Sequence, residues 1–140
     1  MKVFKSVLLI DDDEEDYYLF KQAIKQCCND VTTLIYERDS RVAMTLLTEK
    51  KDFSPDIIFL DWYMPNYSGE DFLTTIRKLP LYSDVPVVIF TGAAPNAFKK
   101  NAKKLGATLF LCKPDSFSEL VKNLKLIFSY EWKYFDNFNI

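Results

Sequence analysis

The side chains in this sequence that could carry chemistry stand directly after short apolar runs. Three aspartates, Asp11–Asp13, follow one such run, and Asp61 follows another. Thr91 and Lys113 come directly after two later runs. Carboxylates that gather in one place raise each other's pKa unless a cation neutralises them. Oxygen ligands favour Mg²⁺ as that cation, and a lysine and a hydroxyl beside them would complete a pocket for a phosphoryl group.

Each of these side chains also has a simpler structural explanation. Asp11–Asp13 could cap a helix and lie in its first turn, and Asp61 could cap a loop. Thr91 before a glycine is a common turn at the end of a strand, and Lys113 could be a solvated loop lysine. Their joint occurrence after four separate apolar runs is much less expected by chance, so the set as a whole indicates a site.

Composition limits the functions that are open to the chain. A length of 140 residues predicts one domain, 1–140, and a net charge of −2 argues against direct DNA binding. The sequence has no histidine, which excludes Ser-His-Asp triads and histidine-bound metals. No segment reaches transmembrane length, and the three cysteines fit neither a disulfide framework nor a zinc site. We therefore expect a cytoplasmic protein with reduced thiols and no membrane contact.

Strand-like and helix-like patterns alternate along the chain, and they must position the site. Short apolar or β-branched runs predict strands at 7–10, 31–36, 56–60, 87–90 and 108–112. Helical periodicity predicts helices at 14–28, 40–50, 69–79 and 96–105, and Ser116 caps a long last helix. Repeated βα units predict a doubly wound, five-stranded parallel α/β fold, in which the carboxyl ends of the strands share one edge. The second strand is the most polar and is expected near an edge of the sheet.

Four motifs give this sequence a resemblance to a known family. Ile10-Asp11-Asp12, Leu60-Asp61-Trp62-Tyr63-Met64-Pro65, Phe90-Thr91-Gly92 and Lys113-Pro114 resemble the response-regulator receiver domains, the CheY-like family, in order and spacing. The resemblance covers Val7 to about Phe128 and is to a single-domain, stand-alone receiver. It implies the strand order 2-1-3-4-5 of the flavodoxin/CheY-like fold.

The resemblance also implies a role for each motif residue in a two-component phosphorelay. Asp61 would be the phosphoacceptor, which takes a phosphoryl group from a sensor histidine kinase or a histidine phosphotransferase. Mg²⁺ (or Mn²⁺) would be bound directly by Asp12, Asp61 and the backbone carbonyl of Tyr63, and largely through water by Asp11. The remaining implied positions are the phosphoryl-binding and switch residues Thr91, Gly92, Lys113 and Phe110, and a cis Lys113–Pro114 peptide.

The implied output is a change of protein–protein contact rather than turnover of a substrate. We expect no enzyme activity beyond self-phosphorylation and self-dephosphorylation, with the face of the fourth helix, fifth strand and fifth helix as the readout towards an unknown downstream protein. Tyr63 places a large ring two residues after Asp61, and we hypothesise that it screens water and lengthens the lifetime of the phosphoryl group. Residues 129–140 form an aromatic extension of the last helix, which could fold back on the domain or serve as a homodimer or partner surface.

One alternative function, a phosphate-transferring relay intermediate, would use the same residues. Other functions fit the sequence less well. An aspartyl-phosphate hydrolase of the haloacid-dehalogenase type needs a second aspartate where Tyr63 stands, and a flavodoxin-like flavin binder needs a phosphate loop where Asp11–Asp13 would repel phosphate. A degenerate receiver that acts only as a scaffold would not need all the motif positions that are present here.

Overall fold

The computed structural model describes residues 3–49, 52–92 and 96–130, and these form one parallel sheet between two layers of helices. The strands are β1 (Ser6–Ile10), β2 (Thr33–Glu37), β3 (Ile57–Leu60), β4 (Val87–Thr91) and β5 (Leu109–Cys112). Their order in the sheet is β2-β1-β3-β4-β5, so the predicted fold and order are confirmed. The polar strand β2 does lie at an edge.

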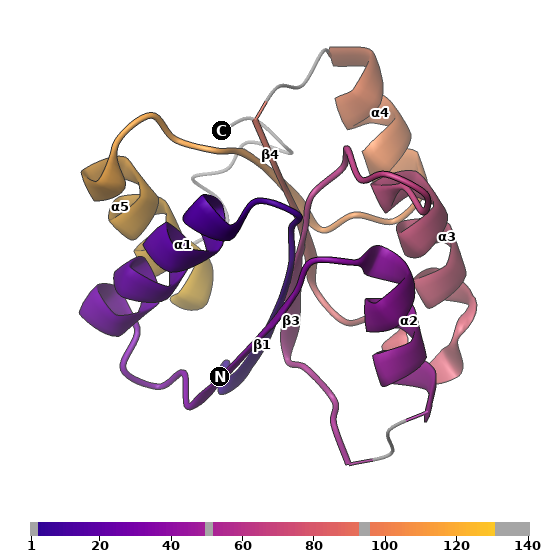
Figure 1. Ribbon diagram of the computed structural model, residues 1–140, viewed down its shortest axis with the longest axis horizontal. Coiled ribbons are helices and arrows are strands. Elements are labelled where there is room, and N and C mark those ends of the chain that lie inside the picture. Colours follow the sequence, from indigo (N-terminus) through magenta and orange to yellow (C-terminus); the bar gives the residue numbers. More distant parts are fainter. Residues whose placement is uncertain (1–2, 50–51, 93–95, 131–140) are drawn as a thin grey trace.

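Helices cover both faces of the sheet, as Figure 1 shows. On one side lie α1 (Glu14–Cys27) and α5 (Phe117–Phe128), and on the other lie α2 (Ser40–Glu49), α3 (Gly69–Lys78) and α4 (Asn96–Lys104). A short 3₁₀ helix, η1 (Pro80–Tyr82), lies in the connection between α3 and β4 (Val87–Thr91). Among the described residues, no helix is long and apolar enough to span a membrane.

The central strands are buried on both faces because their side chains alternate between two apolar cores. One core lies under α2, α3 and α4, and it includes Leu8, Ile58 and Ile89. The other lies under α1 and α5, and it includes Leu9 and Phe59. The packed sheet therefore holds the residues that follow these strands in fixed positions.

Side-chain caps fix where three helices begin. The Asp13 carboxylate accepts hydrogen bonds from the backbone N–H groups of Glu15 and Asp16, and it thereby starts α1 just after β1. Ser68 and Ser116 cap α3 and α5 in the same way. Such caps satisfy N–H groups that have no partner inside the helix, and each is worth about 1 kcal/mol.

Two sequence expectations are wrong at the opposite end of the fold. Helix α5 ends at Phe128, and Ser129 and Tyr130 form a turn in which Tyr130 has a φ of 59°. The extension therefore does not begin as a continuation of the helix, and residues 131–140 lie outside the described residues. Cys27 and Cys28, expected as reduced thiols, are joined as a disulfide, which their adjacency in sequence did not suggest.

Candidate functional site

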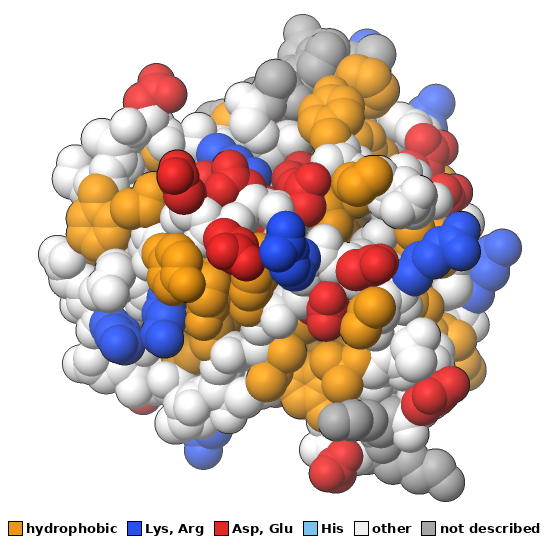
Figure 2. Space-filling view, viewed as in Figure 1, with side chains coloured by type: hydrophobic (Ala, Val, Ile, Leu, Met, Phe, Trp, Pro, Cys, Tyr) orange, Lys and Arg blue, Asp and Glu red, His pale blue; other side chains and the backbone are white. Residues whose placement is uncertain are grey.

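The polar residues that follow the strands meet at one edge of the sheet because the strands are parallel and in register. Ile10 pairs with Leu60, so Asp11 and Asp61, one residue further on, leave the sheet side by side. Carboxylate oxygens of Asp11, Asp12 and Asp61 all lie within 4.8 Å of one another. Acidic side chains gather over the end of β1 and the start of α1 on the face shown in Figure 2.

Asp11 is the most deeply buried of the three carboxylates. It has no exposed surface, and it accepts a hydrogen bond from the backbone N–H of Asp13 at 2.9 Å. Burial raises the pKa of Asp11 from 3.8 to about 6, although the Lys113 ammonium 2.9 Å away opposes the shift. A pKa this high shows that the positive charge near the buried carboxylate does not fully offset the loss of its hydration.

Lys113 provides the positive charge that the site does contain. Its Nζ lies 2.6 Å from Asp16 Oδ2, 2.9 Å from Asp11 Oδ2 and 3.4 Å from Asp61 Oδ2. Burial alone lowers the pKa of this ammonium, but the hydrogen bonds to Asp16 and Asp11 outweigh it and the pKa is raised. Lys113 is therefore a fixed cation, and its shortest contact is not with Asp61.

Asp16 is the site residue that the sequence analysis missed. It lies in the first turn of α1, where Glu14 and Glu15 also stand, and three adjacent acids are ordinary at a helix N-terminus. Only Asp16 reaches Lys113, because it is the one of the three that faces the sheet closely enough. Its partial burial in a run of exposed acids is the structural sign of that role.

Asp61 is held by the loop that follows β3. Asp61 is only 6% exposed, and its Oδ1 accepts a hydrogen bond from the backbone N–H of Tyr63 at 3.2 Å. The loop returns so tightly that a Cβ on Gly69 would lie 2.8 Å from Trp62 Cα and 2.9 Å from the Asp61 carbonyl oxygen. Gly69 therefore permits the close approach that brings α3 against the loop.

The predicted switch residues occupy β4 and β5. Thr91 is fully buried, and its Oγ1 has no hydrogen-bond partner among the described residues. A buried hydroxyl without a partner is uncommon and calls for an explanation, such as an acceptor that binds there. Phe110 is 1% exposed in β5, whereas Gly92 is exposed just after Thr91.

The predicted cis peptide between Lys113 and Pro114 is wrong, because the described residues contain no cis peptide bond. The trans bond still lets the Lys113 N–H donate to the Thr91 carbonyl at 2.7 Å. It also lets the ammonium reach the carboxylates of Asp11, Asp16 and Asp61.

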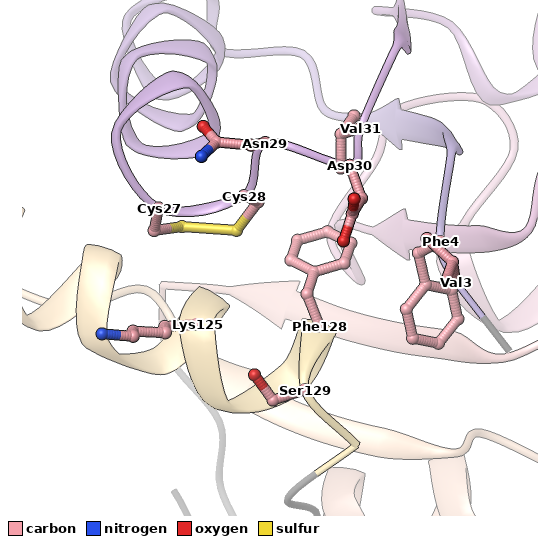
Figure 3. A pocket seen from close by; sticks show the side chains of 10 residues that line it. All are labelled: Val3, Phe4, Cys27, Cys28, Asn29, Asp30, Val31, Lys125, Phe128 and Ser129. Atoms are coloured by element: carbon pink, nitrogen blue, oxygen red, sulfur yellow. A yellow bond between two sulfur atoms is a disulfide. The ribbon is translucent and has the colours of Figure 1, made fainter. Parts of the chain in front are cut away.

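A separate cavity of about 430 Å³ lies at the other edge of the sheet, near the amino ends of the strands. Figure 3 shows that it is bordered by the Cys27–Cys28 disulfide, by the rings of Phe4 and Phe128, and by Asp30. Lys125 points away from its centre in this view. The cavity shares no residue with the acidic cluster, so the two features are independent.

The geometry of the acidic cluster fits a divalent cation. Three carboxylates can each offer an oxygen, and they come from two adjacent strands with rigid registers. All-oxygen ligands suit Mg²⁺ or Mn²⁺, and a cation would favour the ionised form of Asp11, whose pKa is raised mainly by burial.

Comparisons with known proteins agree with this arrangement. The sequence matches the response regulator receiver domain over residues 7–125. It is 27% identical over 130 residues to the response regulator Rcp1 of Synechocystis, covering 90% of this chain and 88% of Rcp1. It is 26% identical over 125 residues to the phosphate regulon transcriptional regulatory protein PhoB of Pseudomonas aeruginosa, covering 89% of this chain. The chain spans about half the length of that relative, 52%.

Solved structures show the same fold. The phosphorylated cyanobacterial phytochrome response regulator RcpA superposes with a TM-score of 0.80 at 22% identity, and the alignment covers 94% of both chains. The Mn²⁺-bound form of Rcp1 superposes with a TM-score of 0.77 at 25% identity, again over 94% of both chains. With the match over residues 7–125 and the acidic pocket at the carboxyl edge, this chain belongs to the response regulator receiver domain family of two-component systems.

Proposed function

We propose that this receiver domain is a phosphorylation switch in which Asp61 accepts a phosphoryl group from the phosphohistidine of a sensor histidine kinase or a histidine phosphotransferase. The observation that carries this proposal is the convergence of Asp11, Asp12 and Asp61 within 4.8 Å, with the Lys113 ammonium bound to two of them. It acts in the cytoplasm, and it turns over no separate substrate.

Asp61 supplies the nucleophile. A carboxylate oxygen of Asp61 attacks phosphorus, the bond from phosphorus to the donor nitrogen breaks, and that nitrogen keeps the electron pair. A carboxylate is a weak nucleophile, so positioning of the reactants and neutralisation of charge must provide most of the acceleration of phosphoryl transfer. The backbone N–H of Tyr63 orients the carboxylate through its hydrogen bond to Oδ1.

Asp11, Asp12 and Asp61 would hold Mg²⁺, joined by the backbone carbonyl of Tyr63. When bound, the cation neutralises the oxygens of the phosphoryl group. Lys113 offers a second positive charge, and it must exchange part of its contact with Asp16 for the new anion. The unpartnered hydroxyl of Thr91 would donate to a phosphoryl oxygen.

The phosphoryl group adds roughly two negative charges, and these favour the conformation in which Thr91 and Lys113 contact it. We propose that Phe110 follows Thr91 in this change and that α4, β5 and α5 present the altered face to a downstream protein. Output through that face requires no DNA contact by this domain.

Incubation with Mg²⁺ and acetyl phosphate, followed by intact-mass measurement, tests this function. The wild-type protein should gain the mass of one phosphoryl group, and Asp61→Asn should gain none. Asp84→Asn, an exposed aspartate outside the cluster, is the matched control and should behave as wild type. Labelling of Asp61→Asn at the wild-type level would contradict the proposal.

A further inference from the structure

Two large aromatic side chains, one in the loop that follows Asp61 and one on α4, contact each other while both remain open to solvent. The rings of Tyr63, in the loop after β3, and Phe98, on α4, have centroids 5.7 Å apart and planes at 85°. Tyr63 is 47% exposed and Phe98 is 38% exposed. Edge-to-face pairs of this kind add stability beyond the area they bury, so the contact holds the two elements together.

The same turn of α4 also reaches the predicted switch residue in β5. Lys99 Nζ lies 5.8 Å from the centroid of the Phe110 ring. Adjacent residues of α4 therefore contact Tyr63, whose N–H binds the Asp61 carboxylate, and Phe110, which is buried in the sheet. A displacement of α4 must change at least one of these two contacts.

Hydrolysis of a phosphorylated Asp61 depends on the access of water to phosphorus. A water oxygen attacks, the bond from phosphorus to the Asp61 oxygen breaks, and the carboxylate keeps the electron pair. The water and its two protons leave as part of dihydrogen phosphate. A ring carried by a residue whose backbone N–H binds the Asp61 carboxylate can limit the approach of water only while that ring is held in place.

We propose that Phe98 is a positioning residue that holds Tyr63 as a cover beside the phosphoryl group, so that the position of α4 sets the lifetime of phosphorylated Asp61. This inference rests on the proposed function and adds a means of regulation to it. A partner that moves α4 would change the lifetime, and a longer-lived phosphoryl group would in turn favour the α4 position that keeps the cover.

The test measures decay of the phosphorylated protein. The 140-residue chain is phosphorylated with acetyl phosphate and Mg²⁺, the donor is removed by desalting, and the remaining phosphorylated fraction is followed by intact mass. The variants are Phe98→Ala, Tyr63→Ala and the double variant. Phe117→Ala is the matched control, because Phe117 is also 38% exposed but lies at the start of α5. Phe98→Tyr is the conservative variant, and melting temperature and Mg²⁺ affinity are recorded for each.

We expect Phe98→Ala and Tyr63→Ala each to shorten the lifetime by roughly two- to tenfold, the range that the coupling of an aromatic pair allows. The double variant should decay no faster than the faster single variant, and Phe98→Tyr should restore the lifetime. Mg²⁺ affinity should stay at the wild-type value, which a general structural effect would not predict. Wild-type decay in Phe98→Ala, or rate changes that multiply in the double variant, would overturn the inference alone. Failure of the wild type to be phosphorylated at Asp61 would overturn the proposed function and this inference with it.

Discussion

Asp11 makes the acidic site a local weakness of the metal-free fold. Its carboxyl has no exposed surface, and burial raises its pKa from 3.8 to about 6. At neutral pH the carboxyl is ionised in both the folded and the unfolded chain, but only the folded chain loses hydration of the charge. Lys113 compensates for part of this loss. A site built to bind a cation is therefore expected to cost stability when no cation is present.

The first prediction concerns Asp11→Asn in metal-free protein. Because the folded-state pKa lies above the unfolded value, the stability linked to this group is fully present below about pH 4 and is lost as pH rises through about 6. An uncharged amide avoids that loss, so the variant should gain about 1–2 kcal/mol of unfolding free energy at pH 7.5. Urea denaturation at pH 7.5, 6 and 5 should show the gain shrinking as pH falls. If Asp11→Asn were less stable than wild type at pH 7.5, this prediction would be wrong. In a separate Mg²⁺ titration, Asp11→Asn should bind the cation at least about tenfold more weakly than wild type.

The second prediction concerns the buried hydroxyl of Thr91. Because Oγ1 has no partner among the described residues, Thr91→Val removes an unsatisfied polar group at nearly constant volume. The unphosphorylated protein should gain up to about 1 kcal/mol of unfolding free energy, since an unsatisfied buried group costs about 1–3 kcal/mol. The gain in melting temperature on adding Mg²⁺ and beryllofluoride, a phosphoryl mimic, should be smaller than in wild type, because the acceptor has lost its donor. An equal gain in both proteins would mean that Thr91 does not contact the phosphoryl group.

At this scale the sequence predicted the identity of most clustered residues but not their pairing. Asp11, Asp12, Asp61 and Lys113 could be named because each ends or follows a strand, and parallel strands bring such positions together. Asp16 could not be named, because a first-turn acid looks the same whether it faces solvent or a distant lysine. The partner, Lys113, lies 97 positions further along the chain, and only the fold joins them.

At the scale of elements, periodicity predicted the strands and helices to within a few residues. The central strands β1, β3 and β4 are buried on both faces, so their apolar runs are continuous and their ends are sharp. The end of α5 was predicted less well, because apolar residues continue at helical spacing beyond Phe128. A tertiary contact sets the end of the helix there, since the Tyr130 ring turns away from the helix and stacks on the Phe4 ring with centroids 4.6 Å apart.

The third prediction tests the loop between β3 and α3. A Cβ on Gly69 would lie within 3.0 Å of Trp62 Cα, the Asp61 carbonyl oxygen and Trp62 Cε3, two of which are backbone atoms that cannot move cheaply. Gly69→Ala should therefore lower the free energy of unfolding by about 1–3 kcal/mol, as overpacking does. Mg²⁺ affinity should fall as well, because the loop holds the Asp61 carboxylate through Tyr63 N–H.

Gly92→Ala is the matched control for stability, because a Cβ at Gly92 would meet nothing within 4 Å. Thermal unfolding of the two variants in parallel separates the effect of the close approach from the general effect of replacing glycine. Equal melting temperatures for Gly69→Ala and wild type would show that the loop relaxes without cost.

At the scale of the whole molecule, the two edges of the sheet have different tasks. The carboxyl edge carries the acidic cluster, whose negative charge Lys113 compensates only in part. The amino edge is closed by apolar packing, in which Phe4 is 2% exposed, stacks on Tyr130 and contacts Phe128 edge to face with centroids 5.7 Å apart. The position of the site could be anticipated because parallel βα units bring the carboxyl ends of the strands to one edge, and the strand order was implied by the family resemblance. The closure of the amino edge could not be anticipated, because it depends on residues from both ends of the described chain.

The last prediction separates the two edges by substitution of Phe4. Phe4→Ala removes a buried ring and its two aromatic contacts, so the free energy of unfolding should fall by about 3–5 kcal/mol. Because Phe4 precedes β1 at the edge opposite Asp61, Mg²⁺ affinity of the folded protein at low temperature should stay within about twofold of wild type, as additivity of distant sites requires. Leu81→Ala, at a side chain that is 72% exposed, is the control and should change stability by less than about 0.5 kcal/mol. Asp11→Asn should show the reverse pattern, with higher stability and weaker Mg²⁺ binding. A large loss of Mg²⁺ affinity in folded Phe4→Ala would show instead that the amino edge transmits strain through β1 to Asp11, and that the site cannot be treated apart from the closure of the fold.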